Sequence, residues 1–574
     1  MTVPASGPPS PPRPINLLRL GFALIGVIAL ICGYLGLDEL LSTRAGFANG
    51  PLDIIYYDLQ LFVLGSPPLD EGGPMPPLLD IARFAAPAVT IYALAEASRV
   101  IFASEVRRLR TRSSRGHAIV CGQTMTAASV ARRLRAAGER VVVVQPAELD
   151  FIRTLSPLWV IGDARDPDVL RAAGVRRATS LYACTDDSAT NTAIALAAGR
   201  RRPTAGPLLR VYAQISDPDL CLTLQARYLG PVHSHGLQLD FFHLDQVAAR
   251  QLCSDSPLGE PTQVPPRVLV AGLNDFGSAL VVELARYWRG RAVAEPAKLP
   301  LLLVDPRATE LVQELGERYP FLADTCDLST RDEDLAALLH REALTADRMF
   351  ICDDDEEHAL KTALIAERIR RDPPRTIVVR LDRLADLREA FDDETGEHFD
   401  QLTTRLRIFG VTQAAGDPAL IGQDLVERLA RVVHDSYLRT ALAGGRVETD
   451  RMSHRPWEEL PESLRAANRS HAEDFGRKLR LIGCLLSPRV GPAQEHELTE
   501  SEIDLLARLE HERWVTERLS QGWQFAERQD DARKLHPALV EWADLPVHLR
   551  EPNFQEICAM PGILADAGFR IVRR

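Results

Sequence analysis

The pattern of hydrophobic and polar positions divides the chain into an apolar start and a long, regularly alternating remainder. The stretch LGFALIGVIALICGYLGL (Leu20–Leu37) contains 18 residues without a charge, close to the length that crosses a bilayer as a helix. A second, weaker apolar segment runs from about Leu78 to Phe102 and contains four charged residues. Together they predict two transmembrane helices joined by a loop, over residues 15–105.

Charged residues around the two segments predict their orientation in the membrane. Arginines lie on the outer flanks of the pair, whereas the loop between the segments has one arginine, Arg44, among several acids. Positively charged flanks stay in the cytoplasm. We therefore expect a multi-pass protein of the inner (cytoplasmic) membrane, with both termini cytoplasmic and an extracytoplasmic loop. A cleaved signal peptide is disfavoured, because the apolar stretch is too long and no A-x-A cleavage site follows it.

Beyond the apolar start, alternating strand and helix patterns predict α/β domains. AIVCG, RVVVVQP and SLYACT are typical of buried strands, and AASVARRLRAAG of a helix between them. Apolar strands that alternate with helices predict a Rossmann-like, doubly wound parallel sheet. The same order begins again at RVLVAG about 150 residues later, which indicates a duplicated domain. We expect the first domain over residues 116–258 and the second over 266–445.

Bulk composition narrows the classes of partner and chemistry. The chain has 574 residues, enough for several domains, and its proline-rich start predicts a disordered tail over residues 1–14. The net charge of −12 gives no reason to expect nucleic acid as a partner. The nine cysteines form no CxxC pair or cysteine–histidine cluster, so neither a metal site nor a disulfide framework is predicted.

The second α/β unit contains the more complete nucleotide-binding turn. Such a turn needs glycine for the bend, for the approach of a pyrophosphate and for helix packing, with an acid after the second strand for the ribose. Here Gly272 and Gly277 are present, and Asn274 replaces the middle glycine. We expect the turn to tolerate Asn274, because asparagine adopts a positive φ more readily than most residues. Asp305 follows the second strand as the ribose partner, and Asp327 is a further candidate.

The first unit contains a degenerate copy of this turn. Gly122 and Ala127 remain, Thr124 stands at the middle position, and the second strand ends at Gln145 rather than at an acid. The hydroxyl of Thr124 offers a contact to a phosphate, but threonine adopts positive φ reluctantly. These residues, together with Asp163, form a weaker candidate site, and a purely structural copy is the favoured interpretation.

Other motifs give no catalytic constellation. The acidic runs CTDDSATN and CDDDEE follow strands, where their acids could contact a ligand or a metal. Acids that complement a helix N-terminus are the commoner explanation. The chain shows no Ser/His/Asp, HExxH or P-loop spacing, so no catalytic residues are assigned and the protein is not expected to be an enzyme.

Three blocks of the first unit resemble the TrkA-N domain, the regulatory nucleotide-binding (RCK or KTN) domain of potassium channels and transporters. They are HAIVCG…VARRLRAAGERVVVV, GDARDPDVLRAAGV and ACTDDSATNTAIALAA. The second unit is similar to it less closely, and the resemblance covers about Gly116–Leu438. It implies cytoplasmic domains that bind NAD(H) or another adenine nucleotide and signal to a membrane pore. Because eight such domains commonly form a ring, two per chain imply a homotetramer.

The C-terminal part resembles a second family, the RyR domain named from ryanodine receptors. EHERW, GW and KLHPALV occur in the expected order within about Leu498–Arg574, and residues 456–483 look like an N-terminal extension. The resemblance implies a mainly helical ligand-sensing or interaction module over residues 452–574, used in nucleotide-linked signalling and defence. Candidate ligand contacts there are His511, Arg513, Lys534 and Trp542, whereas Trp514 and Trp523 are interpreted as core residues.

These features predict a membrane-anchored, nucleotide-responsive regulator, with a ligand-gated potassium channel or channel subunit as one form of it. The loop GPLDIIYYDLQLFVLGSPPLDEGG contains no T-x-G-[YF]-G filter, so selectivity through backbone carbonyls does not carry over from the family. Within this loop, LDIIYYDLQLFVLG (Leu52–Gly65) is instead a candidate re-entrant or interfacial amphipathic helix. The alternative function is a membrane-tethered nucleotide-sensing effector in signalling or phage defence, without a selective pore. An NAD-dependent oxidoreductase is the least supported alternative, because no catalytic constellation accompanies the turns.

Overall fold

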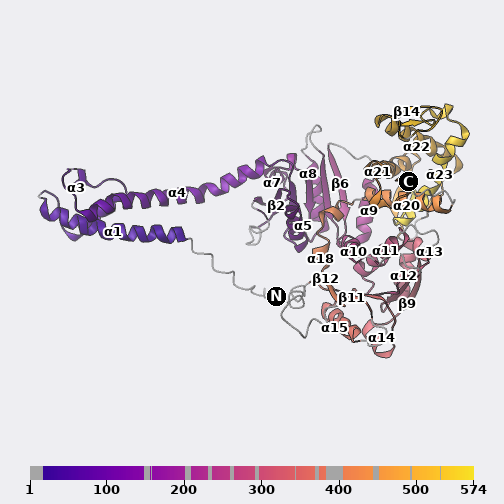
Figure 1. Ribbon diagram of the computed structural model, residues 1–574, viewed down its shortest axis with the longest axis horizontal. Coiled ribbons are helices and arrows are strands. Elements are labelled where there is room, and N and C mark those ends of the chain that lie inside the picture. The colour runs from indigo at the N-terminus through magenta and orange to yellow at the C-terminus, as the bar shows by residue number, and fades with distance from the viewer. Residues whose placement is uncertain are drawn as a thin grey trace. The chain divides into compact units, whose positions relative to one another are not determined.

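The chain forms two compact units, Met1–Arg110 and Thr111–Arg574 (Figure 1). The computed structural model describes residues 17–44, 46–70, 72–147, 156, 158–200, 208–229, 236–256, 258, 264–290, 297–342, 344–368, 374–382, 405–423, 425–443, 452–490, 494–530 and 532–574. The tail expected to be disordered, residues 1–14, lies outside the described residues.

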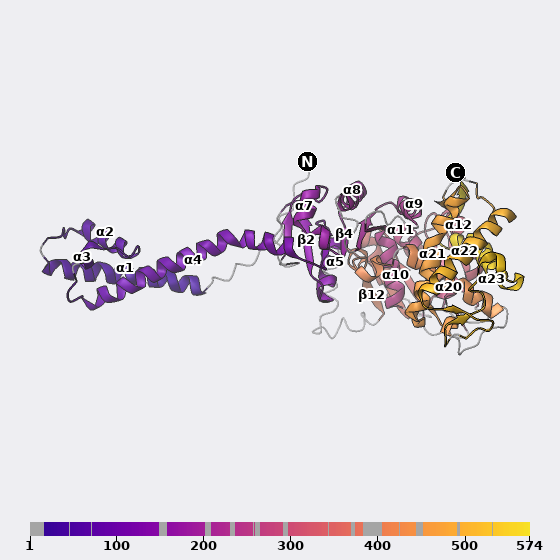
Figure 2. The ribbon, with the colours of Figure 1, turned by 90° about the horizontal axis from the view of Figure 1, so that it is seen from above.

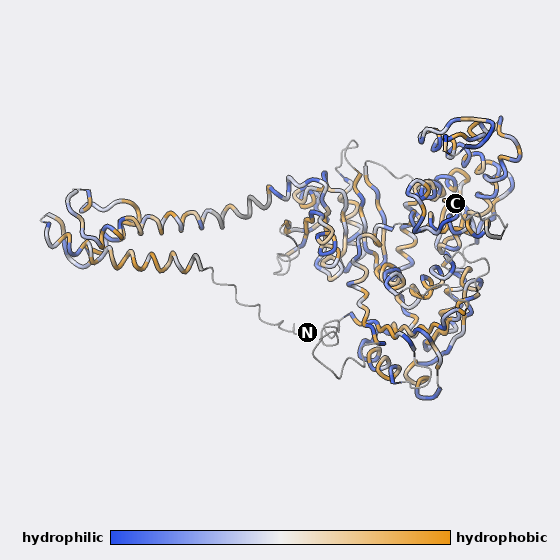
Figure 3. Tube along the Cα trace, in the orientation of Figure 1, coloured by the Kyte–Doolittle hydropathy of each residue, from blue (hydrophilic) through white to orange (hydrophobic). Residues whose placement is uncertain are grey.

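The first unit is built around two long apolar helices, α1 (Leu17–Thr43) and α4 (Pro77–Ser113). Their segments Leu20–Thr43 and Pro77–Ser98 are long and apolar enough to cross a membrane, judged by length and composition. Hydrophobic residues follow one another along both helices (Figure 3). Many of them are exposed side chains.

The loop between the long helices contains a short helix, α2 (Pro51–Leu61), which packs against α1. The proline at its first turn suits that position, because the missing N–H would have no partner in the helix. The contact is close at Gly33, where a Cβ atom would lie 1.8 Å from the Oδ1 of Asp58. A second short helix, α3 (Pro67–Asp70), follows. The segment considered as a re-entrant or interfacial helix is therefore helical up to Leu61.

The second unit begins with a six-stranded parallel sheet in the order β3-β2-β1-β4-β5-β6. Val141–Gln145 is buried along its whole length, because helices cover both faces of a parallel sheet. Its strands are β1 (Ala118–Cys121), β2 (Val141–Gln145), β3 (Leu158–Ile161), β4 (Ser180–Ala183), β5 (Leu209–Gln214) and β6 (Leu237–Phe242). Its helices are α5 (Met125–Ala136), α7 (Pro167–Ala172), α8 (Ser188–Gly199), α9 (Pro218–Tyr228) and α10 (Leu244–Asp255).

A second six-stranded parallel sheet repeats this topology in the order β9-β8-β7-β10-β11-β12. The predicted duplication of a Rossmann-like fold is thereby confirmed. Its strands are β7 (Val268–Ala271), β8 (Leu299–Val304), β9 (Cys326–Arg331), β10 (Arg348–Ile351), β11 (Thr376–Arg380) and β12 (Leu406–Phe409). Its helices are α11 (Asp275–Arg289), α12 (Ala308–Arg318), α13 (Phe321–Thr325), α14 (Leu335–Arg341), α15 (Glu356–Glu367), α18 (Val411–Ala414) and α19 (Pro418–Ile421).

The two α/β domains exchange contacts and share one hydrophobic core. Helix α11, which opens at the turn of the second domain, packs against α10 of the first domain. The reciprocal contact is made by helix α5, which begins at the turn of the first domain and packs against α18 and α19 of the second domain. In this second contact the Ser129 hydroxyl donates to the Gln413 carbonyl at 2.9 Å, and Arg133 pairs with Asp417 at 2.7 Å.

The C-terminal region forms a mainly helical domain closed by a two-stranded antiparallel sheet of β13 and β16. Its core also includes Leu222 and Leu229 of the first α/β domain, so the two are packed together. Figure 2 shows its helices gathered at the end of the second unit opposite β2. Its principal elements are α20 (Leu425–Ala443), α21 (Glu462–Leu481), β13 (Cys484–Pro488), α22 (Glu500–Ser520), α23 (Val547–Asp566) and β16 (Phe569–Arg573).

We predict that Gly416→Ala destabilises the contact between the α/β domains. A Cβ atom on Gly416 would lie 2.4 Å from the side chain of Ser129, and forced overpacking costs about 1–3 kcal/mol. The unfolding temperature of the full-length protein in detergent should fall. Gly316→Ala is the matched control, because nothing lies within 4 Å of that position in α12. An unchanged unfolding temperature for Gly416→Ala would contradict this packing.

Candidate nucleotide-binding turns and the C-terminal aromatic cluster

Two glycines in the second turn are required by its geometry. Gly272 follows β7 with φ +81°, a conformation that side chains rarely adopt. Gly277 lies in the first turn of α11, where a Cβ atom would stand 1.9 Å from the Gly272 carbonyl oxygen. The backbone of α11 can therefore approach the turn only because Gly277 has no side chain, as the nucleotide-binding turn demands.

Asn274 belongs to this turn for a different reason from the one expected. Its φ is −66° and its ψ −172°, so the expected positive φ is wrong. The residue is instead the N-cap of α11: its Oδ1 accepts from the Gly277 N–H at 2.9 Å. Its Nδ2 donates to the Cys352 carbonyl at 2.5 Å. An amide fits this position because it supplies an acceptor to the helix and a donor to the neighbouring strand end.

Asp305 stands where an acid would meet the ribose of a nucleotide. It follows β8 directly, and its Oδ2 accepts from the Leu273 N–H of the turn at 2.9 Å. Asp327 does not join it, because Asp327 is paired in register with Pro300 at the start of β8. The two ends of a strand face opposite edges of the sheet, so the inclusion of Asp327 among the site residues is wrong.

The first turn has the same backbone plan. Gly122 has φ +132°, and a Cβ atom there would lie 2.3 Å from the Cys184 carbonyl oxygen. Thr124 is the N-cap of α5 with φ −80°, so threonine needs no positive φ here. Its hydroxyl accepts from the Ala127 N–H at 3.1 Å and donates to the Cys184 carbonyl at 2.7 Å. The hydroxyl hydrogen is thus already used within the protein rather than offered to a phosphate.

Gln145 and Asp163, the candidate ribose contacts of the first domain, lie in different environments. Gln145 is buried, and its Nε2 donates to the Gly122 carbonyl at 3.1 Å. This hydrogen bond stabilises the turn. Asp163 is exposed and forms a 2.7 Å ion pair with Arg165. The hydrogen bond from Arg165 lowers the pKa of Asp163. The structure therefore supports the interpretation of this turn as the degenerate copy.

The acidic runs after β4 and β10 act mainly as helix caps. Asp187 accepts from N–H groups at the start of α8, and Asp355 does so at the start of α15. In the second run Asp353 accepts from His358 at 2.6 Å, which raises the pKa of that histidine. Asp354 pairs with Arg380 at 2.6 Å and also contacts Asn274. The sheet edge beside the second turn therefore contains several carboxylates, of which two are paired with the basic side chains of Arg380 and His358.

A cavity of about 270 Å³ lies beside the second turn, between the two α/β domains and the C-terminal domain. Its wall includes Asn274 and Asp275 of the turn, together with basic residues on α11, α12 and α20. One of these, Arg318, forms a 2.7 Å ion pair with Asp219 across the domain boundary. A ligand at the second turn would therefore lie next to a space bordered by all three domains.

The candidate residues of the C-terminal domain fall into different environments. His511 is buried and donates through Nε2 to the Val540 carbonyl at 2.8 Å. Trp542 is partly buried, with its ring 5.7 Å from the His511 ring and with Arg550 above it. Lys534 is exposed and donates to the Gln521 carbonyl at 2.9 Å. The aromatic rings of Trp514 and Trp523 contact His536, which extends the cluster.

Arg513 belongs to a buried charge network rather than to an open ligand site. It pairs with Glu510 and with Glu517. Glu510 and Lys478 are almost completely buried and form a direct ion pair. Burial alone would raise the pKa of Glu510, but His471, Lys478 and Arg513 outweigh it and hold that pKa well below its ordinary value. A ligand at Arg513 would have to compete with these two carboxylates for the guanidinium.

Two segments match known protein families. Residues 118–230 match the TrkA-N domain, and residues 495–573 match the RyR domain. The chain thus contains a TrkA-N domain, which holds the first turn, and a C-terminal RyR domain, as the sequence motifs predict. The second α/β domain lies outside the matched residues and is related to the first by its strand order. A comparison with curated proteins finds no similar sequence.

Among solved structures, the chain is similar to several of GsuK. It is 16% identical to GsuK bound to ADP, covering 71% of this chain and 97% of that one with a TM-score of 0.34. It is 13% identical to the GsuK channel bound to NAD, covering 86% and 90% with a TM-score of 0.35. A dipicolinate synthase chain from Bacillus halodurans is 12% identical, with a TM-score of 0.21, and the match covers 57% of this chain and 98% of that one. These superpositions are poor, and the two family matches alone define the classes.

We predict that Glu510→Gln destabilises the C-terminal domain by about 3–5 kcal/mol, because it leaves buried Lys478 and Arg513 without full compensation. The stabilisation from Glu510 is complete above its ordinary pKa of 4.5 and is lost as the pH falls toward the depressed pKa. Thermal unfolding at several pH values measures both effects. Glu512→Gln on the exposed side of α22 is the control. Equal acid sensitivity of Glu510→Gln and the unmodified protein would contradict the assignment.

Proposed function

We propose that this protein is a membrane-anchored regulator that responds to an adenine nucleotide bound at the second turn. The observation that carries the proposal is the combination of Gly272, Gly277 and Asp305. The glycines bring the start of α11 close to the turn, and Asp305 places a carboxylate beside it. Phosphates bind at such helix N-termini through backbone N–H groups and the helix dipole, and the acid accepts from ribose hydroxyls.

The second turn is preferred to the first because of its polar groups. Asp305 is partly exposed, whereas its counterpart Gln145 is buried beneath the turn. The family resemblance of the first domain supports nucleotides as the ligand class, and NAD(H), ADP and ATP all offer a ribose and phosphates. The proposal includes no catalytic step, because the sequence provides no catalytic constellation beside either turn.

The signal from the nucleotide would pass through the packing between domains. Helix α11 opens at the second turn and packs against α10 of the first domain. The first domain is joined to α4 by only the few residues between Ser113 and Ala118. A nucleotide shifts this system only if it binds two arrangements of the domains with different affinity. We further propose a homotetramer in the cytoplasmic membrane, with the RyR domain as a second input.

Two outputs are compatible with this arrangement. The first is a ligand-gated ion pathway formed by α1 and α4, of which a potassium channel would be one form. The second is a tethered nucleotide sensor without a pore. The second is favoured by the loop between the helices, which lacks a T-x-G-[YF]-G filter.

We predict that the full-length protein in detergent binds ADP or NAD, and that Asp305→Asn weakens this binding about tenfold or more, since a hydrogen bond to a charged group contributes about 1.5–3 kcal/mol. The asparagine oxygen can still accept from the Leu273 N–H, but the bond from the Arg307 N–H to Oδ1 of Asp305 is lost. Thermal unfolding of the variant therefore checks that the fold is kept. Gly277→Ala should also weaken binding, whereas Ala127→Gly at the matching position of the first turn should not. Isothermal titration calorimetry measures the Kd. An unchanged Kd for Asp305→Asn would contradict nucleotide binding at the second turn.

Ion flux from liposomes separates the two outputs. A gated pathway predicts potassium flux that changes at least severalfold when ADP or NAD is added at the cytoplasmic side. The same liposomes with the Asp305→Asn variant should show flux that no longer responds to nucleotide. No flux under any nucleotide, from protein that still binds ADP or NAD, would contradict the channel and support the tethered sensor.

A further inference from the structure

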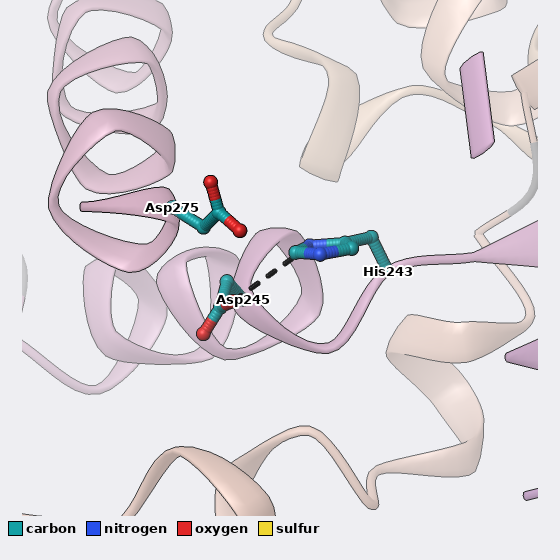
Figure 4. A group of neighbouring side chains, drawn as sticks. All are labelled: His243, Asp245 and Asp275. Atoms are coloured by element: carbon teal, nitrogen blue, oxygen red, sulfur yellow. Dashed lines mark ion pairs between the residues drawn. The ribbon is translucent and has the colours of Figure 1, made fainter. Parts of the chain in front are cut away.

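A histidine and two aspartates converge where the two α/β domains meet. His243 precedes α10, Asp245 lies in the first turn of α10, and Asp275 is the first residue of α11. Figure 4 shows the three side chains as neighbours, with the ion pair between His243 and Asp245 dashed. One nitrogen and two carboxylate oxygens, one from each residue, all lie within 4.8 Å of one another.

His243 leaves one ring nitrogen without a hydrogen bond. The side chain is 4% exposed, and its Nε2 donates to the Ser216 carbonyl at 3.0 Å. This bond fixes the tautomer that has a lone pair on Nδ1. Among the described residues Nδ1 has no hydrogen-bond partner, and the Oδ2 of Asp245 is 3.9 Å away, too far for one. A buried acceptor left in this way normally requires a partner.

We propose that His243, Asp245 and Asp275 bind a divalent transition-metal ion such as Zn²⁺ or Mn²⁺. The imidazole nitrogen and two carboxylates are ligands for such ions, and a second-shell carbonyl on the other ring nitrogen is the usual support of a metal-bound histidine. Ligand atoms around a tetrahedral ion stand about 3.4 Å apart, from metal–ligand distances of about 2.1 Å. The ligand atoms, which lie within 4.8 Å of one another, would therefore need to approach by at most about 1.4 Å.

The charges of the cluster also favour a cation. Burial raises the pKa of the Asp245 carboxyl. His243 and Arg380 oppose this shift, whereas the carboxylates of Asp275 and Asp382 add to it. Crowded carboxylates are costly to keep ionised. A divalent ion would neutralise the charges of the two ligating carboxylates directly. His243 does this poorly, because its Nδ1 is 3.9 Å from the Asp245 carboxylate.

The matching position at the other turn has no such ligands. The residues that correspond to His243 and Asp245 after β12 are Gly410 and Thr412, and Met125 corresponds to Asp275 at the start of α5. The three ligands thus occur at one of the two equivalent domain contacts. A second cluster, His471, Glu510 and Glu556, is a weaker candidate because Lys478 and Arg513 already compensate Glu510.

A metal ion here would tie α10 of the first domain to α11 of the second. His243 and Asp275 also border the 270 Å³ cavity, which leaves room for water in the remaining coordination positions. A further consequence rests on the proposed function: the ion would neutralise Asp275, whose charge opposes a phosphate at the start of α11. Metal and nucleotide should then bind with positive coupling.

Metal binding without nucleotide tests the site directly. Full-length protein without a histidine tag is stripped with chelator in detergent and dialysed against Zn²⁺, Mn²⁺ or Mg²⁺ separately. We expect about one Zn²⁺ or Mn²⁺ per chain at this site, with affinity at least tenfold lower in Asp275→Asn and in His243→Gln. Asp275 is exposed, so Asp275→Asn should keep the fold. Glu556→Gln and Asp332→Asn serve as carboxylate controls and should bind as the unmodified protein does.

Co²⁺ provides a second readout, because its visible absorption reports nitrogen and oxygen ligands. The absorption should appear with the unmodified protein and be lost with His243→Gln. No stoichiometric Zn²⁺ or Mn²⁺, equal affinity in Asp275→Asn, or loss in Glu556→Gln instead would each overturn the site. These outcomes do not depend on nucleotide binding, so the site can fail while the proposed function stands, and the reverse also holds.

Discussion

The contact between the two α/β domains determines how the rest of the second unit is built. Each helix that opens at a glycine turn packs against the helix that follows the sixth strand of the other sheet. The two sheets consequently share one hydrophobic core, and neither turn can move without disturbing its partner domain. Close-packed interiors of this kind respond to a ligand by switching between discrete arrangements rather than by deforming gradually. The turns are therefore placed where local binding can alter the relation of the domains.

Duplication has left the two turns alike in backbone and different in chemistry. Both begin with a glycine of positive φ against a strand-end carbonyl, and both use a polar N-cap, Thr124 or Asn274. The ribose position is buried and neutral in the first domain but acidic and accessible in the second. The proposed metal ligands are likewise confined to the second turn and its contact with α10. Among these positions, the acidic and accessible groups that suit a ligand thus lie at the second turn.

The sequence predicts the fold well because buried parallel strands are apolar throughout and alternate with helices. The duplication, the caps at Asp187 and Asp355 and the two family segments follow from local patterns. The details of the site do not. The pattern singles out Asn274 for its backbone, whereas its side chain caps α11; Asp327 is in a neighbouring strand but at its wrong end. The three proposed metal ligands are near in space only through packing between domains, and no spacing in the chain reveals that.

Hydrogen–deuterium exchange of the full-length protein, with and without saturating ADP or NAD, tests the central claim most directly. We expect slower exchange in residues 272–278 and in α10, because the ligand binds at the second turn and α10 packs against α11, the helix that begins there. Exchange in residues 122–128 should change less. Protection confined to the first turn, or to the RyR domain with no change in residues 272–278, would contradict the account.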